Sequence, residues 1–465
     1  MPKRRRIDRG DQAAHQRKTH RRVLRKCALA AAAIAPLVIT GSIGAALLPA
    51  AASRPAAKSG HVNLQMWIAG NSTTEPIYDA EAATFSKTHP GVTVTVTDLP
   101  GPAYTTKLDT GLAANKLPAI YQEYSAGPEL QQLARNKKIV NLSPFLKTNP
   151  VIGRRILPSA LAQGQINGQQ YAIPYNIFQE IVLIYNKADF AKAHIKQAPS
   201  TWTEFTNDIA KLKRSGFIPL SISGTEADNW YELYLENYEV RSAGLGVTDA
   251  LQKGHLSALG SAPVVKAAAA MQQLVRSGAF EPGYTTTSEA NDVPYALLGT
   301  GKAAMILYGA FLPNFIDEAV PGFAASGKMG WFSFPSVPGG KGNSVIDLSS
   351  QPELVVNANM NKLAIKDAEE FLSNFVYSPG QVAALARTAN VGPIANSLQL
   401  VKRWAPSDLK SYMLFEVSEA HASSSFISWS QYLPLAETTN WNNLLTQLFS
   451  LSITPSQFAA SAARL

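Results

Sequence analysis

The segment Gly168–Lys187 constrains the fold of this chain more than any other stretch. It reads GQQYAIPYNIFQEIVLIYNK, and its second half, Ile181–Tyr185, is a continuous apolar run. Such a run is typical of a parallel strand that is buried on both faces. Before it, Pro174 interrupts an alternating pattern, removes a ladder donor and fixes φ, so the connection is bent. The segment therefore predicts a strand that leaves one compact body and enters another, with a hinge between them.

The length of the chain predicts two bodies, and the location of its charge argues against a nucleic-acid-binding protein. A chain of 465 residues is longer than one core usually supports. The net charge is +9, but residues 1–26 hold 11 Lys or Arg and two Asp, which leaves 31 basic and 31 acidic residues elsewhere. Because the body of the protein is neutral, no basic surface for a phosphate backbone is expected.

Residues 1–52 are typical of an export signal. A cationic region is followed by an apolar core, Cys27–Leu48, and by small residues that predict cleavage after Ala52. The pair Arg21-Arg22 resembles a twin-arginine signal, and the general secretory route stays open beside it. An uncleaved membrane anchor is the alternative. In each case the body, after a linker at residues 53–60, is exported to the extracellular face of the cytoplasmic membrane, to a periplasm or to the medium. Cys27 is the only cysteine, so the body holds no disulfide.

The first body begins with a β-α-β pattern. Val62–Trp67 alternates as a strand, a helix follows through Phe85, and Val92–Thr97 alternates again. A helix at Tyr104–Asn115 and a short strand at Ala119–Gln122 come next. Ligands of such sheets bind at the carboxyl ends of strands. This rule selects candidate ligand-binding residues, with solvated loop positions as the alternative for each: Asn71, Ser72, Glu123 and Tyr124.

The second body carries a capping box and an aromatic-rich helix. Thr201-Trp-Thr-Glu204 has the capping-box pattern, which predicts a helix from Trp202 to Arg214. Further along, Tyr231 and Tyr234 are expected mainly in the core, because aromatic residues at helical spacing usually face inward. Asn229 and Trp230, at the start of that helix, are candidates for ligand contact.

Common catalytic and metal-binding motifs are absent from the sequence. A phosphate loop around Gly299–Met305 would need a glycine at position 296 and a hydroxyl residue at position 303. Both positions hold alanine, so this motif is absent. The seven histidines are scattered, and neither G-x-S-x-G nor H-E-x-x-H occurs. We expect no metal, no cofactor and no enzyme activity.

Six short segments, in the same order along the chain, resemble the family 1 extracellular solute-binding proteins of carbohydrate ABC importers. They are Trp67, His89–Val92, Leu112–Pro118, Gly168–Lys187, Pro199–Phe205 and Gly299–Met305. The resemblance implies an α/β, two-lobed, periplasmic-binding-protein-like fold of type II with a three-segment hinge. With the hinge placed at the bent connections, lobe 1 comprises residues 61–176 and 337–380, and lobe 2 comprises residues 177–336 and 381–465.

The resemblance also implies a function and further site residues. In the family a buried strand ends in a glycine and a large aromatic residue that stacks on sugar. Gly309 and Phe311 match this pattern, with Phe311 where tryptophan is common. The implied ligand is a sugar or oligosaccharide, and the implied partners are the transmembrane subunits of an ABC permease. The protein is expected to be a monomer that meets the membrane only through its leader or the permease. The remaining candidates for the site are Tyr175, Tyr308, Ser350, Gln351 and Trp441.

Two other classes remain open. A secreted glycoside hydrolase would use paired carboxylates such as Glu123 and Asp228, although nothing in their local spacing marks an acid and base pair. A structural surface protein would not respond to small ligands.

Overall fold

The computed structural model describes most of the chain after the predicted leader. The described residues are 61–70, 74–99, 101–124, 127–176, 180–225, 229–348, 352–388, 390–420 and 424–465. The leader (1–52), the linker (53–60) and some candidate residues lie outside these ranges: Asn71, Ser72, Asp228, Ser350 and Gln351.

The first sheet has five strands in the order β2-β1-β3-β12-β6. β1 pairs in parallel with β2 and with β3, whereas β12 runs antiparallel to β3 and β6. The β-α-β unit predicted from the sequence is therefore confirmed. The strands are β1 (Val62–Ala69), β2 (Val92–Leu99), β3 (Ile120–Tyr124), β6 (Ile173–Pro174) and β12 (Pro352–Val356).

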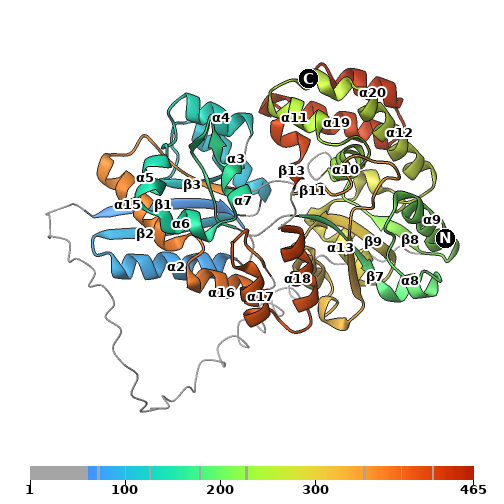
Figure 1. Ribbon diagram of the computed structural model, residues 1–465, viewed down its shortest axis with the longest axis horizontal. Coiled ribbons are helices and arrows are strands. Elements are labelled where there is room, and N and C mark those ends of the chain that lie inside the picture. The colour runs from blue at the N-terminus through green and yellow to red at the C-terminus, as the bar shows by residue number, and fades with distance from the viewer. Residues whose placement is uncertain are drawn as a thin grey trace, which may run out of the picture. The chain divides into compact units, whose positions relative to one another are not determined.

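Helices cover both faces of the first sheet, and Figure 1 shows α3 and α4 on one side of it and α2 on the other. Leu64, Met66 and Ile68 alternate along β1 and belong to the larger core, which includes Phe371 of α15. Tyr104 of α3 joins the core on the opposite face. The helices are α2 (Glu75–Thr88), α3 (Gly101–Ala113), α4 (Pro128–Arg135), α5 (Ser143–Thr148), α6 (Pro150–Arg155), α7 (Pro158–Gln163), α15 (Lys362–Phe375), α16 (Pro379–Arg387) and α17 (Ser397–Trp404), and β4 (Gln165–Ile166) pairs with β5 (Gln169–Gln170).

The second sheet has four strands in the order β10-β7-β9-β8. The strands are β7 (Ile181–Asn186), β8 (Ile218–Ser221), β9 (Ala303–Gly309) and β10 (Met329–Ser333). β7 is nearly completely buried, as its apolar run predicts, but it runs antiparallel to both β9 and β10. The expectation of a parallel strand is wrong on this point, because an unbroken apolar run reports burial on two faces and carries no information on strand direction.

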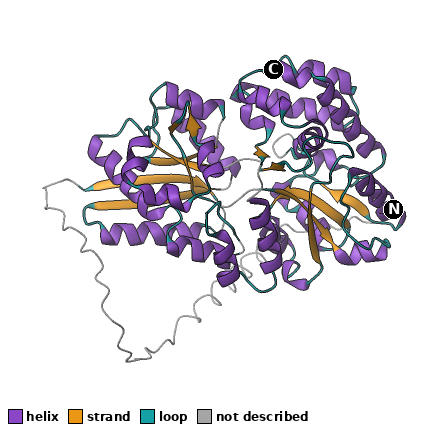
Figure 2. Cartoon of the chain, in the orientation of Figure 1, coloured by secondary structure: helices purple, strands orange, loops and turns teal. Residues whose placement is uncertain are grey.

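Helices surround the second sheet as well, and Figure 2 shows their large share of this part of the chain. The capping box is confirmed: Thr201 Oγ1 accepts from the Glu204 amide and Glu204 reaches back to the Thr201 amide. The helices are α8 (Lys187–Lys192), α9 (Trp202–Arg214), α10 (Tyr231–Ala243), α11 (Gly246–Gln252), α12 (Ala262–Arg276), α13 (Val293–Gly299), α14 (Leu312–Ala319), α18 (Lys410–Ala420), α19 (Thr438–Phe449) and α20 (Pro455–Ala462), with the short pair β11 (Ile346–Asp347) and β13 (Ser425–Phe426).

Three connections join the elements of the two sheets. The first follows β6, the second runs from β10 to β12, and the third lies between α17 and α18. α16 packs on α2, and the Leu157 amide donates to the Pro393 carbonyl, so the chain stays with the first sheet beyond residue 380. In contrast, Tyr412 of α18 contacts Trp331 of β10. From these contacts we propose that the third crossing lies at residues 405–409 rather than near residue 380.

In the part of the chain that the structure describes, no helix combines the length and the apolar character that a membrane span requires.

Candidate ligand site

Three of the candidate residues form an aromatic cluster at the end of β9. The rings of Trp230 and Tyr308 are stacked, with centroids 4.0 Å apart and planes inclined by 16°. Phe311 meets the edge of Tyr308, with centroids 5.3 Å apart and an angle of 79°. Trp230 is buried, whereas Tyr308 and Phe311 are half-buried. Residues 78 and 81 positions apart in sequence therefore build one cluster of packed aromatic rings, which we call the aromatic platform (Trp230, Tyr308 and Phe311).

The turn after β9 sets the position of the platform. Gly309 pairs with Ile181 at the last position of the strand, and a Cβ atom at Gly309 would collide with the ring of Phe311. Glycine is thus required here because the ring folds back over the backbone. The Ala310 amide donates to the Glu180 carbonyl at 2.7 Å, and the Tyr412 hydroxyl donates to the Ala310 carbonyl.

Two aromatic residues that the sequence argument did not select extend the platform. Tyr295 lies beside Trp230, with ring centroids 5.9 Å apart, and Phe315 lies beside Phe311 at 5.4 Å. Phe311 and Phe315 are four residues apart at the start of α14, so helical spacing could have identified the second ring. Tyr295 on α13 offers no comparable local signal.

Asn229 uses its side chain to position helices. Its Oδ1 accepts from the Tyr231 amide at 3.0 Å, and its Nδ2 donates to the Asn442 carbonyl at 3.1 Å and to Thr446 Oγ1 at 3.3 Å. These bonds tie the start of α10 to α19. Asn229 is therefore next to the platform in sequence but is engaged in structural contacts.

Trp441 lies in the interior, with 0% of its surface exposed. Its indole Nε1 donates to Glu232 Oε1 at 3.1 Å, and its ring packs near Phe458. Burial raises the pKa of Glu232 to about 7, and the bonds from Ser430 and Trp441 oppose this rise. These contacts favour a core role for Trp441 over a stacking role.

At the first sheet, Gln122 of β3 connects Tyr175, directly after β6, with the end of β1. Its Oε1 accepts from the Tyr175 hydroxyl at 2.5 Å and from the Ala69 amide at 3.1 Å. Tyr175 is completely buried, and Tyr124 is half-buried at the end of β3. Burial, followed by the charge of Glu123, raises the pKa of Tyr124, so both phenols remain protonated donors.

Glu123 points away from this group. Strand alternation places Glu123 on the same face as Tyr121, which packs beneath α3 and α4. Glu123 is 3% exposed and its Oε1 has no partner among the described residues. Burial, then the neighbouring Glu129 and Asp109, raises its pKa well above the ordinary value. A neutral carboxyl in this position is a poor candidate for a direct ligand contact.

Asp98 is a candidate that the sequence argument missed. It lies near the carboxyl end of β2, and it contacts Gly70 at the end of β1. Burial, followed by the charges of Glu75 and Asp79, raises its pKa to about 7. The rule that selected residues 71 and 72 applies equally to the end of β2 and could have identified Asp98.

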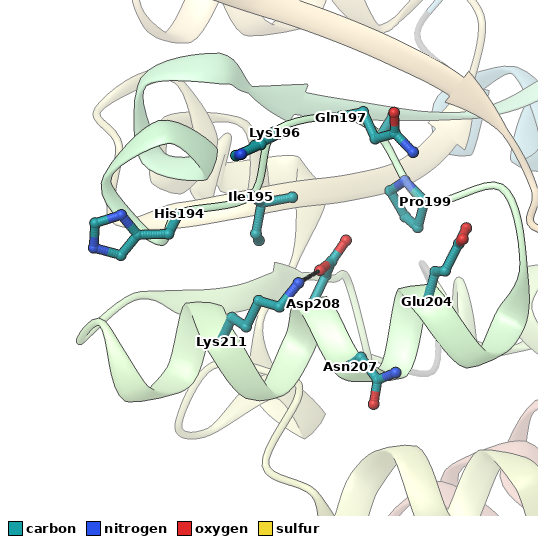
Figure 3. A pocket seen from close by; sticks show the side chains of 10 residues that line it. His194, Ile195, Lys196, Gln197, Pro199, Glu204, Asn207, Asp208 and Lys211 are labelled. Atoms are coloured by element: carbon teal, nitrogen blue, oxygen red, sulfur yellow. Dashed lines mark hydrogen bonds and ion pairs between the residues drawn. The ribbon is translucent and has the colours of Figure 1, made fainter.

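A separate pocket of about 390 Å³ lies between residues 194–199 and α9 (Figure 3). Figure 3 shows Lys211 directed at Asp208, and the ion pair measures 2.7 Å. Glu204, also on its wall, is engaged in the capping box. Its carboxylates already have partners, so we assign no ligand to this pocket.

Comparison with known families resolves the class of the protein. The family model described as "Bacterial extracellular solute-binding protein" matches residues 69–383. The chain belongs to this family. The matched residues include the aromatic platform and the first two of the three expected connections between the lobes. The match confirms the resemblance drawn from the sequence.

Individual relatives of this solute-binding protein are distant. A binding protein of Brucella abortus (strain 2308) is 26% identical over 275 residues, which span 58% of this chain and 62% of the relative. The sn-glycerol-3-phosphate-binding periplasmic protein of Rhizobium meliloti (strain 1021) is 27% identical over 44% of this chain and 47% of its own length. A solved chitin oligosaccharide binding protein has a TM-score of 0.74 at 21% identity, covering 87% of this chain and 97% of its own, so the two share the two-lobed α/β fold.

Proposed function

We propose that this solute-binding protein binds a neutral sugar or oligosaccharide and delivers it to the permease of an ABC importer. The aromatic platform at the end of β9 is the observation that carries the proposal. Aromatic faces pack on the apolar faces of sugar rings, while polar groups supply the hydrogen bonds that buried hydroxyls require. The fold shared with a chitin oligosaccharide binding protein supports the same class of ligand.

The charges near the candidate residues favour a neutral ligand over a phosphorylated one. Phosphate recognition commonly uses arginine in bidentate contacts or lysine as a point charge. At the first sheet the described acidic groups include Asp98, Glu123 and Glu353, and Lys107 stacks its ammonium on the ring of Trp67, 4.2 Å from the centroid. Lys107 is therefore already engaged with an aromatic ring, whereas glycerol phosphate, which the name of the Rhizobium relative gives as that protein's ligand, would need a cation for its phosphate.

A glycoside hydrolase is less well supported. Glu123 lies beneath α3 and α4 with a raised pKa, so it offers a buried neutral acid rather than an accessible member of a catalytic pair. Its suggested partner Asp228 lies outside the described residues. The family consists of solute-binding proteins, which also favours binding without turnover.

Binding would close the two lobes on the ligand because only the closed form contacts it from both sides. The bent connections after β6 and after β10 would absorb the change in dihedral angles. Export through the N-terminal signal and docking of the closed form on transmembrane permease subunits complete the proposal, with the protein acting as a monomer.

The decisive experiment is a ligand panel on the protein from residue 53 onward. It should contain xylo-, chito- and malto-oligosaccharides, their monosaccharides and sn-glycerol-3-phosphate. We expect a few neutral sugars to raise the melting temperature, to bind in calorimetry and to be recovered unchanged by chromatography.

Each other outcome rejects a part of the proposal. Tight binding of sn-glycerol-3-phosphate without sugar binding rejects the neutral ligand. Release of shorter sugars favours the hydrolase, and no response across the panel favours the structural surface protein.

A further inference from the structure

Three carboxyl groups meet next to the first and third connections. Glu180 directly precedes β7 and is 1% exposed, Glu416 on α18 is 3% exposed, and Glu419 lies one turn further along the same helix. The side chains of Glu180 and Glu419 lie close enough to interact. Two carboxyl groups this close together can share a hydrogen bond only when one of them carries a proton. We call Glu180, Glu416 and Glu419 the carboxyl cluster.

The positive charge near this cluster is too small to neutralise it. Arg241 is the only Lys, Arg or His among the described residues with a buried position, and it faces both Glu180 and Glu419 as well as Asp347 of β11. One guanidinium balances one carboxylate at most. Glu180 Oε2 and Glu416 Oε2 have no hydrogen-bond partner among the described residues, so ionised forms of both groups would remain buried with too little compensation from Arg241.

The protonated forms are accordingly favoured in the folded protein. Burial, then the charges of Glu419 and Glu416, raises the pKa of Glu180, while Arg241 opposes this rise. Burial also raises the pKa of Glu416. A group with a raised pKa stabilises the fold fully at acidic pH, and this contribution is lost as the pH rises through the folded-state pKa.

Hydrogen bonds connect the cluster to the aromatic platform. The Glu180 carbonyl accepts from the Ala310 amide at 2.7 Å, and the hydroxyl of Tyr412, on α18, donates to the Ala310 carbonyl. Ala310 directly precedes Phe311. A displacement of α18 would thus release one of the two bonds that hold the turn under the platform.

A cavity gives solvent access to the cluster. It has a volume of about 530 Å³, and its walls include Arg241, Ser333 and Glu419. Ser333 Oγ, at the end of β10, donates to Glu419 Oε2 at 3.0 Å. Because a half-buried carboxylate lines this cavity, protons can reach the cluster without unfolding of the protein.

We propose that the carboxyl cluster is a proton-operated latch. When it is protonated, the cluster holds α18 against β7 and β10 and fixes the turn at Ala310. When it is deprotonated, its carboxylates repel one another and α18 is released. The latch rests on the proposed function only in its consequence for the ligand, because the movement of α18 can be measured without any ligand. The positioning residues are Glu180 and Glu416, which act on Phe311 through the backbone.

Hydrogen exchange tests the latch in the ligand-free protein. Peptides that cover residues 410–420 and Ala310 should exchange about tenfold faster near pH 9 than near pH 6, after correction for the intrinsic rate, if local opening of α18 follows deprotonation. The double variant Glu180→Gln and Glu416→Gln should keep the same protection at both pH values. The control Asp408→Asn removes one exposed carboxylate next to α18 and should behave as the wild type.

Two results would overturn the latch. One is equal protection of α18 at both pH values in the wild type. The other is an unchanged pH dependence in the double variant, or in each single variant if the double variant does not fold. Neither result depends on the sugar panel, so failure of the latch and failure of the proposed function can be told apart.

Discussion

The end of β9 and the ends of the first-sheet strands present their candidate residues in different ways. At β9, ring packing dominates: Trp230, Tyr308 and Phe311 touch face to face or edge to face. At the first sheet, hydrogen bonds dominate: Gln122 accepts from the Tyr175 hydroxyl and from the Ala69 amide. We call these three residues the hydrogen-bond hub.

This difference predicts that the two regions respond differently to substitution. The burial of apolar ring surface is non-directional, so the platform can tolerate changes in ring size at a moderate cost in affinity. A buried hub is directional, and loss of its acceptor leaves donors without partners. We therefore expect substitutions at the platform to act mainly on ligand affinity and substitutions at the hub to act mainly on folding stability.

The largest expected effect is at the hub. Gln122→Ala should lower the free energy of unfolding by about 2–3 kcal/mol, because the buried Tyr175 hydroxyl and the Ala69 amide both lose their acceptor. Urea denaturation of wild type and variant measures this difference. Gln122→Glu, which keeps an acceptor oxygen, separates loss of the acceptor from loss of side-chain volume. A destabilisation below about 0.5 kcal/mol in Gln122→Ala would show that the hub is not structural.

The next effect tests whether Trp441 belongs to the core. Trp441→Phe removes part of a completely buried ring and the N–H donor to Glu232, and should cost about 2 kcal/mol of stability. Sugar affinity measured by calorimetry should not change. A loss of affinity with full stability would place Trp441 at the ligand instead.

Phe311→Ala addresses the platform directly. We expect at least about tenfold weaker binding of the sugar found in the panel, because a stacking face worth roughly 1.4 kcal/mol is lost, and little change in melting temperature. Phe315→Ala is a matched control, since Phe315 is half-buried in the same cluster and contacts Phe311. Equal losses in the two variants would indicate a packing effect rather than a sugar contact.

The smallest effect is a change in pH dependence at the first sheet. Burial raises the pKa of Asp98 to about 7, so its contribution favours the fold at acidic pH and is lost as the pH rises through 7. Asp98→Asn should therefore flatten the fall in melting temperature between about pH 5 and pH 8, and only modestly because Asp98 is half-buried. Thermal denaturation at several pH values measures this, with Asp408→Asn, an exposed carboxylate that does not act on Asp98, as control. Parallel curves for wild type and Asp98→Asn would contradict the raised pKa.

The sequence alone determined the local elements and the class of this protein. Alternation along Val62–Ala69 and the capping box at Thr201 and Glu204 depend on neighbouring residues, and the structure has these elements as expected. The six short segments, among them Gly168–Lys187 and Gly299–Met305, pointed to the solute-binding family that the family model confirms. Such features are readable because they are encoded within one turn or one strand.

Only the tertiary structure decided which distant residues meet and which face each one occupies. The apolar run in β7 reported burial, but its antiparallel direction depends on pairing with β9 and β10. Glu123 lies on the face of β3 that α3 and α4 cover, and Trp441 packs in the interior. The local hydrophobic pattern indicates which stretches are buried, whereas the partners of a residue are set by contacts between segments far apart in the chain, which have no local signature.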